Sequence, residues 1–532
     1  ECLFFFVPVV FGCRASLQMD SRKRQRTESP SPCSLRGGKE DPDGEKLYFD
    51  SYAMLGIHEA MLRDTVRTEG YYNAIMHHKA RFQNKVVIDV GCGTGILSIF
   101  CAWAGAKHVY AIEASGMAEH ARNVVKENGL EGTVTVVHGK VEDIELEDSL
   151  GLPVAAHVII SEWMGYFLYY ESMLESVLLA RDRWLVPEGI LFPSHAVLYL
   201  CPLTDDQYYS DRVLFWQSVY GASMSSLFDH AKHCAFDNVI IDTVHPFQCF
   251  AFPEIIKFID CRNCTIEEVQ NFKATFNFKS MIVTNFHGFV GYFTTIFTTE
   301  EEIRATLPPL AQSAIPSDNG PVPNGTAAED NVSGSVLSDA SRLLLQRLLR
   351  RDPKVNLLHT LSTSPECAGT HWQQALFFTA DQLLMLQDQE LVGEIVVGQC
   401  NDNKRYLDIQ LHWTIMPHEN PSQWLPNPAI VHPHKRLPAQ SARGIQRYQP
   451  SAQARPWVNP YATHTQGHMV THSGSAPGAA NCPAYAGAAN PPAYPDPGAN
   501  FVLQEPDTQN QIEEPNPPMT TLYAHSKVFG FK

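Results

Sequence analysis

The sequence has little of three features that would place it in common classes of protein. Its first apolar run, residues 3–11, is too short to cross a membrane and follows no basic residue, so it makes a poor signal peptide. Its 13 cysteines follow no repeated metal-ligand spacing, and Cys261 and Cys264 offer only two of the four ligands of a structural zinc. We therefore expect no metal site, no membrane association and a reducing compartment inside the cell.

Positive charge is also scarce. Lys and Arg number 40 against 57 Asp and Glu, which gives a formal net charge of −17 and argues against direct binding to nucleic acid. The same charge suits basic partners, such as arginine-rich proteins. With 532 residues and 44% hydrophobic content, the chain can bury a large core, and we expect two ordered domains with flanking tails.

A glycine-rich loop follows an apolar segment near residue 90. Residues 86–98 read VVIDVGCGTGILS, which predicts a buried strand, then a loop with Gly91, Gly93 and Gly95, then a helix. The third glycine comes one residue too early for a dinucleotide-binding fingerprint, and the loop has no lysine for a phosphate. With Asp89 at the end of the strand, the pattern indicates the loop that binds S-adenosylmethionine (AdoMet) in methyltransferases.

Two later strands add candidate contacts for the same cofactor. A strand over residues 108–112 ends in Glu113, about 20 residues past the loop, where a carboxylate can bind both hydroxyls of a ribose. The next strand, residues 134–138, is followed by Val141 and Glu142, which offer an apolar wall and a hydrogen-bond acceptor to an adenine. We therefore predict AdoMet as the cosubstrate.

Two glutamates lie among aromatic residues after another apolar strand. Residues 157–171 read HVIISEWMGYFLYYE, so Glu162 and Glu171 frame a segment of Trp, Tyr and Phe. Two carboxylates in an apolar turn repel each other and raise a pKa, whereas a planar guanidinium binds both through its N–H donors. The segment therefore predicts a site for an arginine side chain. The alternative is that Ser161 and Glu162 begin a helix and that Glu171 lies on its solvated face.

Together these motifs resemble the protein arginine N-methyltransferases that form asymmetric dimethylarginine (type I). The resemblance rests on the glycine loop, Glu113, the segment with two glutamates and the tripeptide Thr370-His371-Trp372, in that order. It runs from about Leu47 to Met416 and is closest to the subfamily numbered six, through residues 191–196 and the lack of an N-terminal accessory domain. It implies a Rossmann-like α/β domain that binds AdoMet, followed by an antiparallel β-barrel-like domain with a helical dimerisation arm.

The resemblance also implies roles for matching residues. Glu162 and Glu171 hold the substrate arginine and, with the pair Asp64 and His371, form the catalytic set. The residues implied in AdoMet binding are Tyr52, His58, Arg67, Asp89, Gly91, Gly93, Gly95, Glu113, Val141 and Glu142. Those implied in the substrate pocket are Tyr48, Met61, Met164 and Trp372. The charge of Arg67 suits the methionine carboxylate of AdoMet, which needs a fixed cation.

The expected function is methyl transfer from AdoMet to guanidino nitrogens of arginine in proteins such as histones and Gly/Arg-rich proteins. The expected products are monomethylarginine and asymmetric dimethylarginine, made by a homodimer without a metal. Two alternatives stay open. The glycine loop would also serve an AdoMet methyltransferase that acts on a small molecule, and a non-catalytic scaffold could bind arginine-rich partners through the same glutamates.

Composition changes along the chain predict its domains. Residues 1–46 are expected to be a disordered leader. Within it, residues 1–18 read as an artefact ahead of Met19, and the basic cluster at residues 21–26 is typical of a nuclear localisation signal. We therefore expect the protein in the nucleus and also in the cytoplasm. The AdoMet-binding domain is predicted over residues 47–193, beginning with a helix that covers the cofactor.

The second domain, predicted over residues 194–416, has short strands rich in Val, Ile, Phe and Tyr, which favour an antiparallel sheet. The resemblance places the dimerisation arm at residues 205–236. There we expect five apolar side chains to face a partner, and the alternative is a helical hairpin packed on its own barrel. These side chains are Tyr208, Val213, Phe215, Trp216 and Tyr220.

Two further segments lack the pattern of a folded domain. Residues 299–357 include a Pro/Ser/Gly/Asn stretch and are expected to be a disordered insertion, although four leucines could line one helix face: Leu344, Leu345, Leu348 and Leu349. The tail, residues 417–532, is rich in Pro, Ala, Gly and Asn and is expected to be disordered as well.

Overall fold

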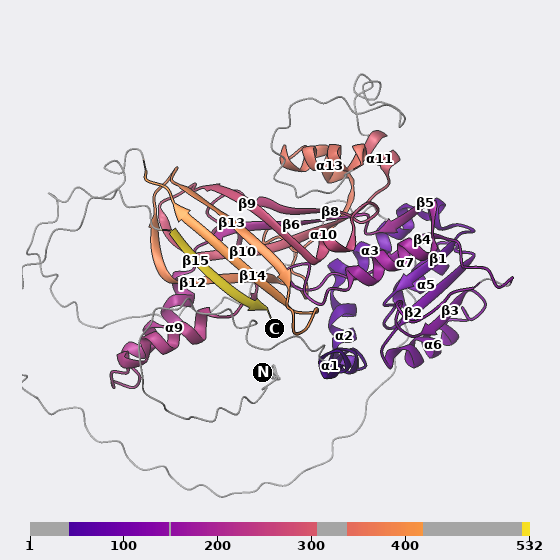
Figure 1. Cartoon of the computed structure of the whole chain (residues 1–532), viewed down its shortest axis with the longest axis horizontal. Coiled ribbons are helices and arrows are strands. Elements are labelled where there is room, and N and C mark those ends of the chain that lie inside the picture. Colours follow the sequence, from indigo (N-terminus) through magenta and orange to yellow (C-terminus); the bar gives the residue numbers. More distant parts are fainter. Residues whose placement is uncertain (1–41, 148–149, 306–337, 419–523, 532) are drawn as a thin grey trace, which may run out of the picture. The chain divides into compact units, whose positions relative to one another are not determined.

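The computed structural model describes residues 42–147, 150–305, 338–418 and 524–531, and Figure 1 shows how their helices and strands are arranged. The first domain is built on a parallel sheet in the order β3-β2-β1-β4-β5. Its strands are β1 (Val86–Val90), β2 (His108–Glu113), β3 (Val134–His138), β4 (Ala156–Ser161) and β5 (Leu185–Phe192). The predicted strands are therefore present, and their order brings the ends of β1, β2 and β4 together.

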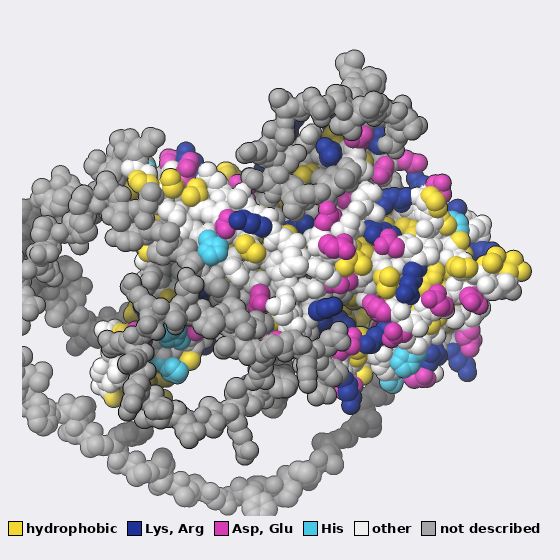
Figure 2. Space-filling view, in the orientation of Figure 1, with side chains coloured by type: hydrophobic (Ala, Val, Ile, Leu, Met, Phe, Trp, Pro, Cys, Tyr) yellow, Lys and Arg dark blue, Asp and Glu magenta, His cyan; other side chains and the backbone are white. Residues whose placement is uncertain are grey.

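Helices pack against this sheet and connect its strands. They are α5 (Ile96–Trp103), α6 (Met117–Glu127) and α7 (Leu174–Trp184). Each of these helices packs buried apolar residues against the strands. Strand β1 has four of its five residues buried, so both faces of the sheet must be covered there. On the face shown in Figure 2, Lys and Arg are interspersed with Asp and Glu among the described residues, so this face offers no basic patch to a nucleic acid.

Four helices precede the sheet: α1 (Pro42–Tyr52), α2 (Leu55–Arg63), α3 (Thr65–His77) and α4 (Lys79–Phe82). The helix expected to start near Tyr48 begins at Pro42, so the last residues of the predicted disordered leader are helical, which corrects that prediction. The rest of the leader lies outside the described residues. Asp64 ends α2 and caps α3 by accepting a hydrogen bond from the Arg67 backbone N–H, which fixes the turn between these helices.

The second domain consists of two antiparallel sheets, as the sequence predicts. The larger sheet has the order β7-β12-β10-β6-β8, with β11 beside β10, and the smaller has the order β15-β14-β13-β9. The strands of the larger sheet are β6 (His195–Leu203), β7 (Ile240–Asp242), β8 (Glu254–Asp260), β10 (Thr284–Phe297), β11 (His359–Ser362) and β12 (Gln374–Met385). The smaller sheet contains β9 (Asn271–Lys279), β13 (Glu390–Gln399), β14 (Leu407–Ile415) and β15 (Ala524–Phe531).

Aromatic residues fill the space between these sheets. Strand β9 alternates exposed and buried residues along its whole length, and its inward positions include Phe276 and Phe278, which pack near Phe289 of β10. The core continues into the parallel-sheet domain, where Tyr71 of α3 lies edge-on to Phe297 at a ring distance of 4.9 Å. The two domains therefore share one hydrophobic core, which fixes α3 against the end of β10.

The predicted disordered insertion is partly ordered. Residues 300–305 form α11 (Glu300–Ala305), and after the undescribed residues 306–337 the chain forms α13 (Asp339–Leu349) and a short 3-10 helix η4 (Pro353–Leu357). Leu344 and Leu345 are buried against the barrel, whereas Leu349 is 58% exposed. The leucine face thus covers the protein's own domain, which corrects the expectation of disorder over 338–357.

The predicted disordered tail also contains one ordered element. Strand β15 pairs with β14 and extends the smaller sheet, and Lys527 of β15 donates hydrogen bonds to the carbonyls of Phe236 and Phe378. The expectation of disorder is therefore wrong for residues 524–531, while residues 419–523 lie outside the described residues. Strand pairing satisfies the backbone hydrogen-bonding groups of this segment, and Phe529 is buried in the core.

The predicted dimerisation arm is mainly helical, with α8 (Asp206–Arg212), η1 (Leu214–Gln217), η2 (Ser225–Leu227) and α9 (Phe228–Phe236). Tyr208 stacks on Phe378 of the barrel, and Val213 is fully buried, so these two side chains pack on their own domain instead of facing a partner. Phe215 is 53% exposed and Tyr220 is fully exposed, as expected for a contact surface. Among the described residues, no helix combines the length and apolarity that a membrane span requires.

Candidate functional site

The glycine loop joins β1 to α5 and has the conformation that only glycine adopts without strain. The φ angles are +71° at Gly91, +53° at Gly93 and +85° at Gly95. A methyl group on Gly93 would lie 3.1 Å from the His58 ring, so α2 approaches the loop closely. The ring of His58 is buried, and its Nε2 lies 2.8 Å from the Tyr52 carbonyl oxygen, which ties the end of α1 to this helix.

Glu113 is held beside this loop at the end of β2. Its Oε2 accepts a hydrogen bond of 2.8 Å from the Gly93 N–H, and its Oε1 accepts one of 2.8 Å from the Ser115 N–H. The side chain is buried, yet each carboxylate oxygen has further capacity to accept hydrogen bonds. The position suits the predicted contact with a ribose.

Asp89 lies beneath the loop. It is fully buried and accepts a 2.6 Å hydrogen bond from the Ser98 hydroxyl of α5. Burial raises the pKa of Asp89 to about 7. Asp89 was predicted to bind the cofactor. In the structure its carboxylate accepts a hydrogen bond from Ser98, and this bond fixes the start of α5.

The predicted adenine contacts lie after β3. Val141 is buried, and its carbonyl accepts a hydrogen bond from Arg183. The Glu142 carboxylate accepts a 2.6 Å hydrogen bond from the Ser176 hydroxyl of α7, so its side chain lies along that helix. Both residues are near the carboxyl ends of the parallel strands, where a cofactor of such a sheet binds.

The segment with the two glutamates is a tightly folded loop between β4 and α7. Positive φ angles occur at Phe167, Leu168, Glu171 and Ser172, which are strained positions for residues other than glycine. Gly165 permits the fold, because a methyl group there would lie 1.8 Å from the Tyr170 carbonyl oxygen. The alternative, in which Ser161 and Glu162 begin a helix, is wrong, since Ser161 ends β4 and α7 begins at Leu174.

Glu162 is almost buried and has one oxygen without a partner. Its Oε2 accepts a hydrogen bond of 2.9 Å from Arg67 Nε, and both side chains are 8% exposed. Its Oε1 is buried and makes no hydrogen bond. A buried carboxylate oxygen without a donor is unfavourable by about 1–3 kcal/mol or more, so the geometry calls for an N–H donor from a ligand.

Glu171 is held by two tyrosines of α1. The hydroxyls of Tyr48 and Tyr52 donate to its Oε2 at 2.8 Å and 2.7 Å. Burial raises the pKa of Glu171, and the negative charge of Glu162 raises it further, whereas the two tyrosine hydrogen bonds lower it. The two carboxylates therefore interact electrostatically, as the sequence predicts. Tyr52 was predicted to bind the cofactor, whereas its hydroxyl donates a hydrogen bond to Glu171.

Arg405 completes this part of the site and was not among the residues predicted from the sequence. It lies in the connection between β13 and β14, where its backbone carbonyl accepts a hydrogen bond from the Glu171 N–H and its Nη1 donates to the Glu171 carbonyl. Its guanidinium lies 3.8 Å from the centre of the Tyr48 ring and 3.6 Å from the Glu45 carboxylate. Arg405 therefore fixes both the strained backbone at Glu171 and helix α1.

Asp64 and His371 form the predicted pair across a large sequence separation. The Asp64 Oδ2 lies 2.7 Å from His371 Nδ1 and accepts a 2.8 Å hydrogen bond from the His371 backbone N–H. Burial acts to raise the pKa of Asp64, but the hydrogen bonds from His371 and Arg67 outweigh it and hold the pKa below its usual value. Asp64 also caps α3, so the pair links Arg67 to the loop before β12.

The predicted substrate-pocket residues surround the two glutamates. Met164 is buried, its sulfur accepts from the Tyr71 hydroxyl at 3.7 Å, and its carbonyl accepts from Trp372 Nε1 at 2.8 Å. Met61 lies at the end of α2, and its carbonyl accepts from Arg67 Nη1. The site therefore combines a glycine loop for a nucleoside, a cation in Arg67 and two carboxylates that can bind a planar cation.

Two family models match the chain. A methyltransferase domain matches residues 87–189, and the arginine methyltransferase oligomerization subdomain matches residues 194–314 and 353–418. The match to the oligomerization subdomain omits residues 315–352, which are most of the predicted insertion at residues 299–357.

Protein arginine N-methyltransferases from other organisms match most of the chain. One is "Probable protein arginine N-methyltransferase 6" of Arabidopsis thaliana, 41% identical over 403 residues, which are 75% of this chain and 85% of that protein. Another is "Protein arginine N-methyltransferase 1" of Chlamydomonas reinhardtii, 36% identical over 70% of this chain and 90% of that protein.

Solved structures show the same fold. A chain of the Trypanosoma brucei PRMT1 enzyme-prozyme heterotetrameric complex with AdoHcy is similar, with a TM-score of 0.53 and 31% identity over 69% of this chain and 96% of that chain. Arabidopsis thaliana protein arginine methyltransferase 10 gives a TM-score of 0.52 and 31% identity, over 69% of this chain and 95% of that chain.

Proposed function

The chain belongs to the protein arginine N-methyltransferase family and transfers methyl groups from AdoMet to arginine in proteins, and on this premise we propose that its final product is asymmetric dimethylarginine. The observation that carries the proposal is the pair of carboxylates in one buried site. Glu162 Oε1 lacks a donor, and Glu171 interacts electrostatically with Glu162. One guanidinium can donate to both carboxylates at once.

Methyl transfer from a sulfonium is an in-line displacement, in which the arginine nitrogen bonds to the methyl carbon as the carbon–sulfur bond breaks. The nitrogen, methyl carbon and sulfur must lie in line, and such positioning can contribute roughly 7–11 kcal/mol to the lowering of the barrier. The two glutamates orient the guanidinium and draw its positive charge toward the nitrogens that do not attack. Tyr48, Tyr52 and Arg405 hold Glu171 for this role.

The attacking nitrogen must lose a proton after the methyl group is added. The raised pKa of Glu171 makes its carboxylate a better proton acceptor than an ordinary glutamate. His371 with Asp64 offers a second route, because its ring is only partly buried and can pass the proton to water. When Glu171 is the acceptor, it releases the proton to solvent after the product leaves, so either route returns the enzyme to its starting protonation state.

In this proposal two methionines, Met61 and Met164, determine the product by flanking the end of the pocket that accepts the methyl group. Trp372, whose indole N–H donates to the Met164 carbonyl, closes that end. A monomethylated arginine can then present the same nitrogen again, while the bulk of Met61 disfavours the opposite nitrogen. A difference of about 1.4 kcal/mol between the two orientations gives a tenfold preference for the asymmetric product.

The substrate class, oligomer and location belong to the same proposal. The net charge of −17 favours basic substrates, of which core histones and Gly/Arg-rich proteins are the candidates. The exposed Phe215 and Tyr220 favour a homodimer formed through the arm. The basic cluster at residues 21–26 favours the nucleus, with a further pool in the cytoplasm.

Product analysis tests the proposed reaction. The full-length protein is incubated with isotope-labelled AdoMet and either core histones or a Gly/Arg-rich peptide, and the methylated arginines are separated by mass spectrometry through their neutral losses. Asymmetric dimethylarginine should predominate after monomethylarginine. A predominance of the symmetric isomer, or of monomethylarginine at long times, would overturn the product assignment. Methylation of neither substrate would favour the non-catalytic scaffold.

A further inference from the structure

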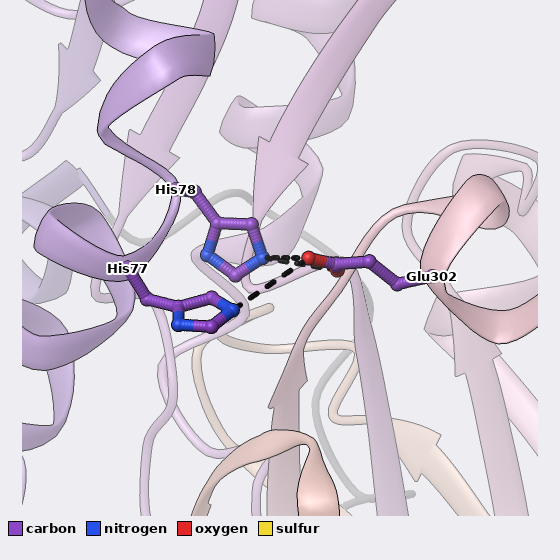
Figure 3. A group of neighbouring side chains, drawn as sticks. All are labelled: His77, His78 and Glu302. Carbon is purple, nitrogen blue, oxygen red and sulfur yellow. Dashed lines mark hydrogen bonds and ion pairs between the residues drawn. The ribbon is translucent and has the colours of Figure 1, made fainter. Parts of the chain in front are cut away.

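Two histidines and one glutamate meet where the two domains are in contact (Figure 3), and the ring of a third histidine lies beside them. His77 ends α3, His78 is the residue after it, Glu302 lies on α11 and His359 begins β11. His78 Nε2 lies 2.9 Å from Glu302 Oε1, and His77 Nε2 lies 3.9 Å from the same oxygen. The ring of His359 is 4.3 Å from the ring of His77, centre to centre.

This cluster is separate from the AdoMet site. Arg67 lies near the beginning of α3 and His77 at its end, which places them about 15 Å apart at a rise of about 1.5 Å per residue. The helix nevertheless connects the two places, since the same α3 carries Arg67 and Tyr71 into the active site and His77 into the cluster.

The hydrogen bonds of His78 identify which of its nitrogens faces a ligand. Its ring is buried, and Nδ1 lies 2.7 Å from the Ala74 carbonyl oxygen, an acceptor that requires a proton on Nδ1. In the neutral ring Nε2 then carries a lone pair, which points at the Glu302 carboxylate. A histidine that binds a metal has this arrangement, with one nitrogen donating to a carbonyl and the other facing the ion.

Glu302 is also oriented by a surrounding set of donors. Its Oε2 accepts hydrogen bonds from the Thr298 hydroxyl at 3.0 Å and from the Thr299 N–H at 2.9 Å. Both carboxylate oxygens lie close to His78 Nε2, Oε1 at 2.9 Å and Oε2 at 3.0 Å. These contacts fix the direction of the Glu302 carboxylate toward the histidine nitrogens.

We propose that His77, His78 and Glu302 bind one divalent zinc ion, which ties the end of α3 to α11. Their ligand atoms all lie within 4.8 Å of one another. Zinc bonds of about 2.0–2.1 Å at tetrahedral angles separate ligand atoms by about 3.3 Å, a value between the two distances measured from Glu302 Oε1. Imidazole nitrogen with carboxylate oxygen is a ligand set that suits zinc.

His359 and water are the candidates for the fourth ligand, because the His359 ring lies beside His77. The ion is structural in this proposal and takes no part in methyl transfer. The spacing of the cysteines, from which we expected no metal, carries no information on this cluster. Glu302 and His359 are far from His77 in the chain, and they reach it through the contact of Glu302 with His78 and the packing of β11 on α3.

Zinc uptake by the full-length protein tests the site. The protein is stripped with a chelator, given Zn²⁺ and passed through gel filtration, and the zinc bound per chain is measured by atomic emission, with affinity measured by calorimetry. His77→Ala removes a ligand whose side chain is more than half exposed, so the fold should be preserved. Glu302→Gln removes the anionic ligand. His120→Ala, an exposed histidine of α6, is the matched control.

The wild type and His120→Ala should each bind one zinc ion, whereas both cluster variants should bind it at least about tenfold more weakly. Zinc should raise the unfolding temperature of the wild type and not that of His77→Ala. AdoMet affinity should be the same in all these proteins. If the stripped wild type takes up no zinc, or if His77→Ala and Glu302→Gln bind as much as the control, the proposal is overturned and His78 with Glu302 is an ion pair alone.

Discussion

Arg67 Nε lies 2.9 Å from Glu162 Oε2, and in the proposed mechanism this ion pair joins the part of the site that binds the AdoMet carboxylate to the part that binds the arginine. Removal of the Arg67 side chain should therefore weaken AdoMet binding and also slow methyl transfer. We expect Arg67→Ala to weaken AdoMet binding by about 1.5–3 kcal/mol, the range for a hydrogen bond to a charged group, and to lower kcat because Glu162 loses its orientation.

Calorimetry with AdoMet and steady-state kinetics with a Gly/Arg-rich peptide check this prediction. Arg63→Ala is the control, since the Arg63 side chain is 77% exposed and forms an ion pair with Glu59 on the same helix. Its AdoMet affinity and kcat should match the wild type. Unchanged AdoMet affinity in Arg67→Ala would show that another group holds the methionine carboxylate.

Activity should depend on pH through Glu171. Because burial raises the pKa of Glu171, the acidic limb of the kcat/KM profile should lie above the value of 4.5 for an ordinary glutamate. The hydroxyls of Tyr48 and Tyr52 lower that pKa by stabilising the carboxylate, so Tyr48→Phe with Tyr52→Phe should move the limb to still higher pH. The kcat/KM profile is measured against pH in the wild type and in the double variant. If the acidic limb stays in place or moves to lower pH in the double variant, the limb belongs to a group other than Glu171.

Arg405 should act as a positioning residue. In Arg405→Ala the bonds from its guanidinium to the Glu171 carbonyl and to α1 are lost, so kcat should fall while the peptide KM changes less. Lys404→Ala is the neighbouring control, because the Lys404 side chain is exposed. Arg405→Lys should restore part of kcat through its charge. Equal loss of folding stability and activity, without a change in the pH profile, would reduce Arg405 to a purely structural role.

Assembly should depend on exposed side chains of the arm. Phe215→Ser with Tyr220→Ser leaves Tyr208 and Val213 packed on the barrel, so the chain should fold but dissociate. Light scattering should then report a monomer, with reduced methyl transfer. Phe247→Ser, an exposed phenylalanine outside the arm, should leave the oligomer intact. A double variant of unchanged mass and activity would place the interface elsewhere.

The sequence predicted the parts of the site that lie on local patterns. Gly91, Gly93 and Gly95 take the positive φ angles that their spacing indicates, and Glu113 lies beside them at the end of the next strand. The pairing of Asp64 with His371 depended on the family resemblance, because nothing local joins residues so far apart in the chain.

Long-range packing accounts for what the sequence missed. Arg405 lies in a short connection with no motif of its own, and only the approach of the barrel to α1 places it over Tyr48. Residues 524–531 follow a long segment rich in Pro, Ala, Gly and Asn and were included in the predicted disordered tail, but the edge of β14 supplies their hydrogen bonds. The four leucines indicated the face of helix α13, but disorder was expected because their packing against the barrel could not be read from the sequence.

The most direct test of the two-glutamate site is the comparison of turnover and AdoMet affinity in Glu171→Gln. The amide oxygen can still accept from Tyr48 and Tyr52, so the fold and the AdoMet site should be preserved. We expect kcat on a Gly/Arg-rich peptide to fall roughly 10²-fold or more, with AdoMet affinity unchanged, while Glu127→Gln on the exposed face of α6 behaves as the wild type. Turnover close to that of the wild type in Glu171→Gln would contradict the binding of one guanidinium by both carboxylates.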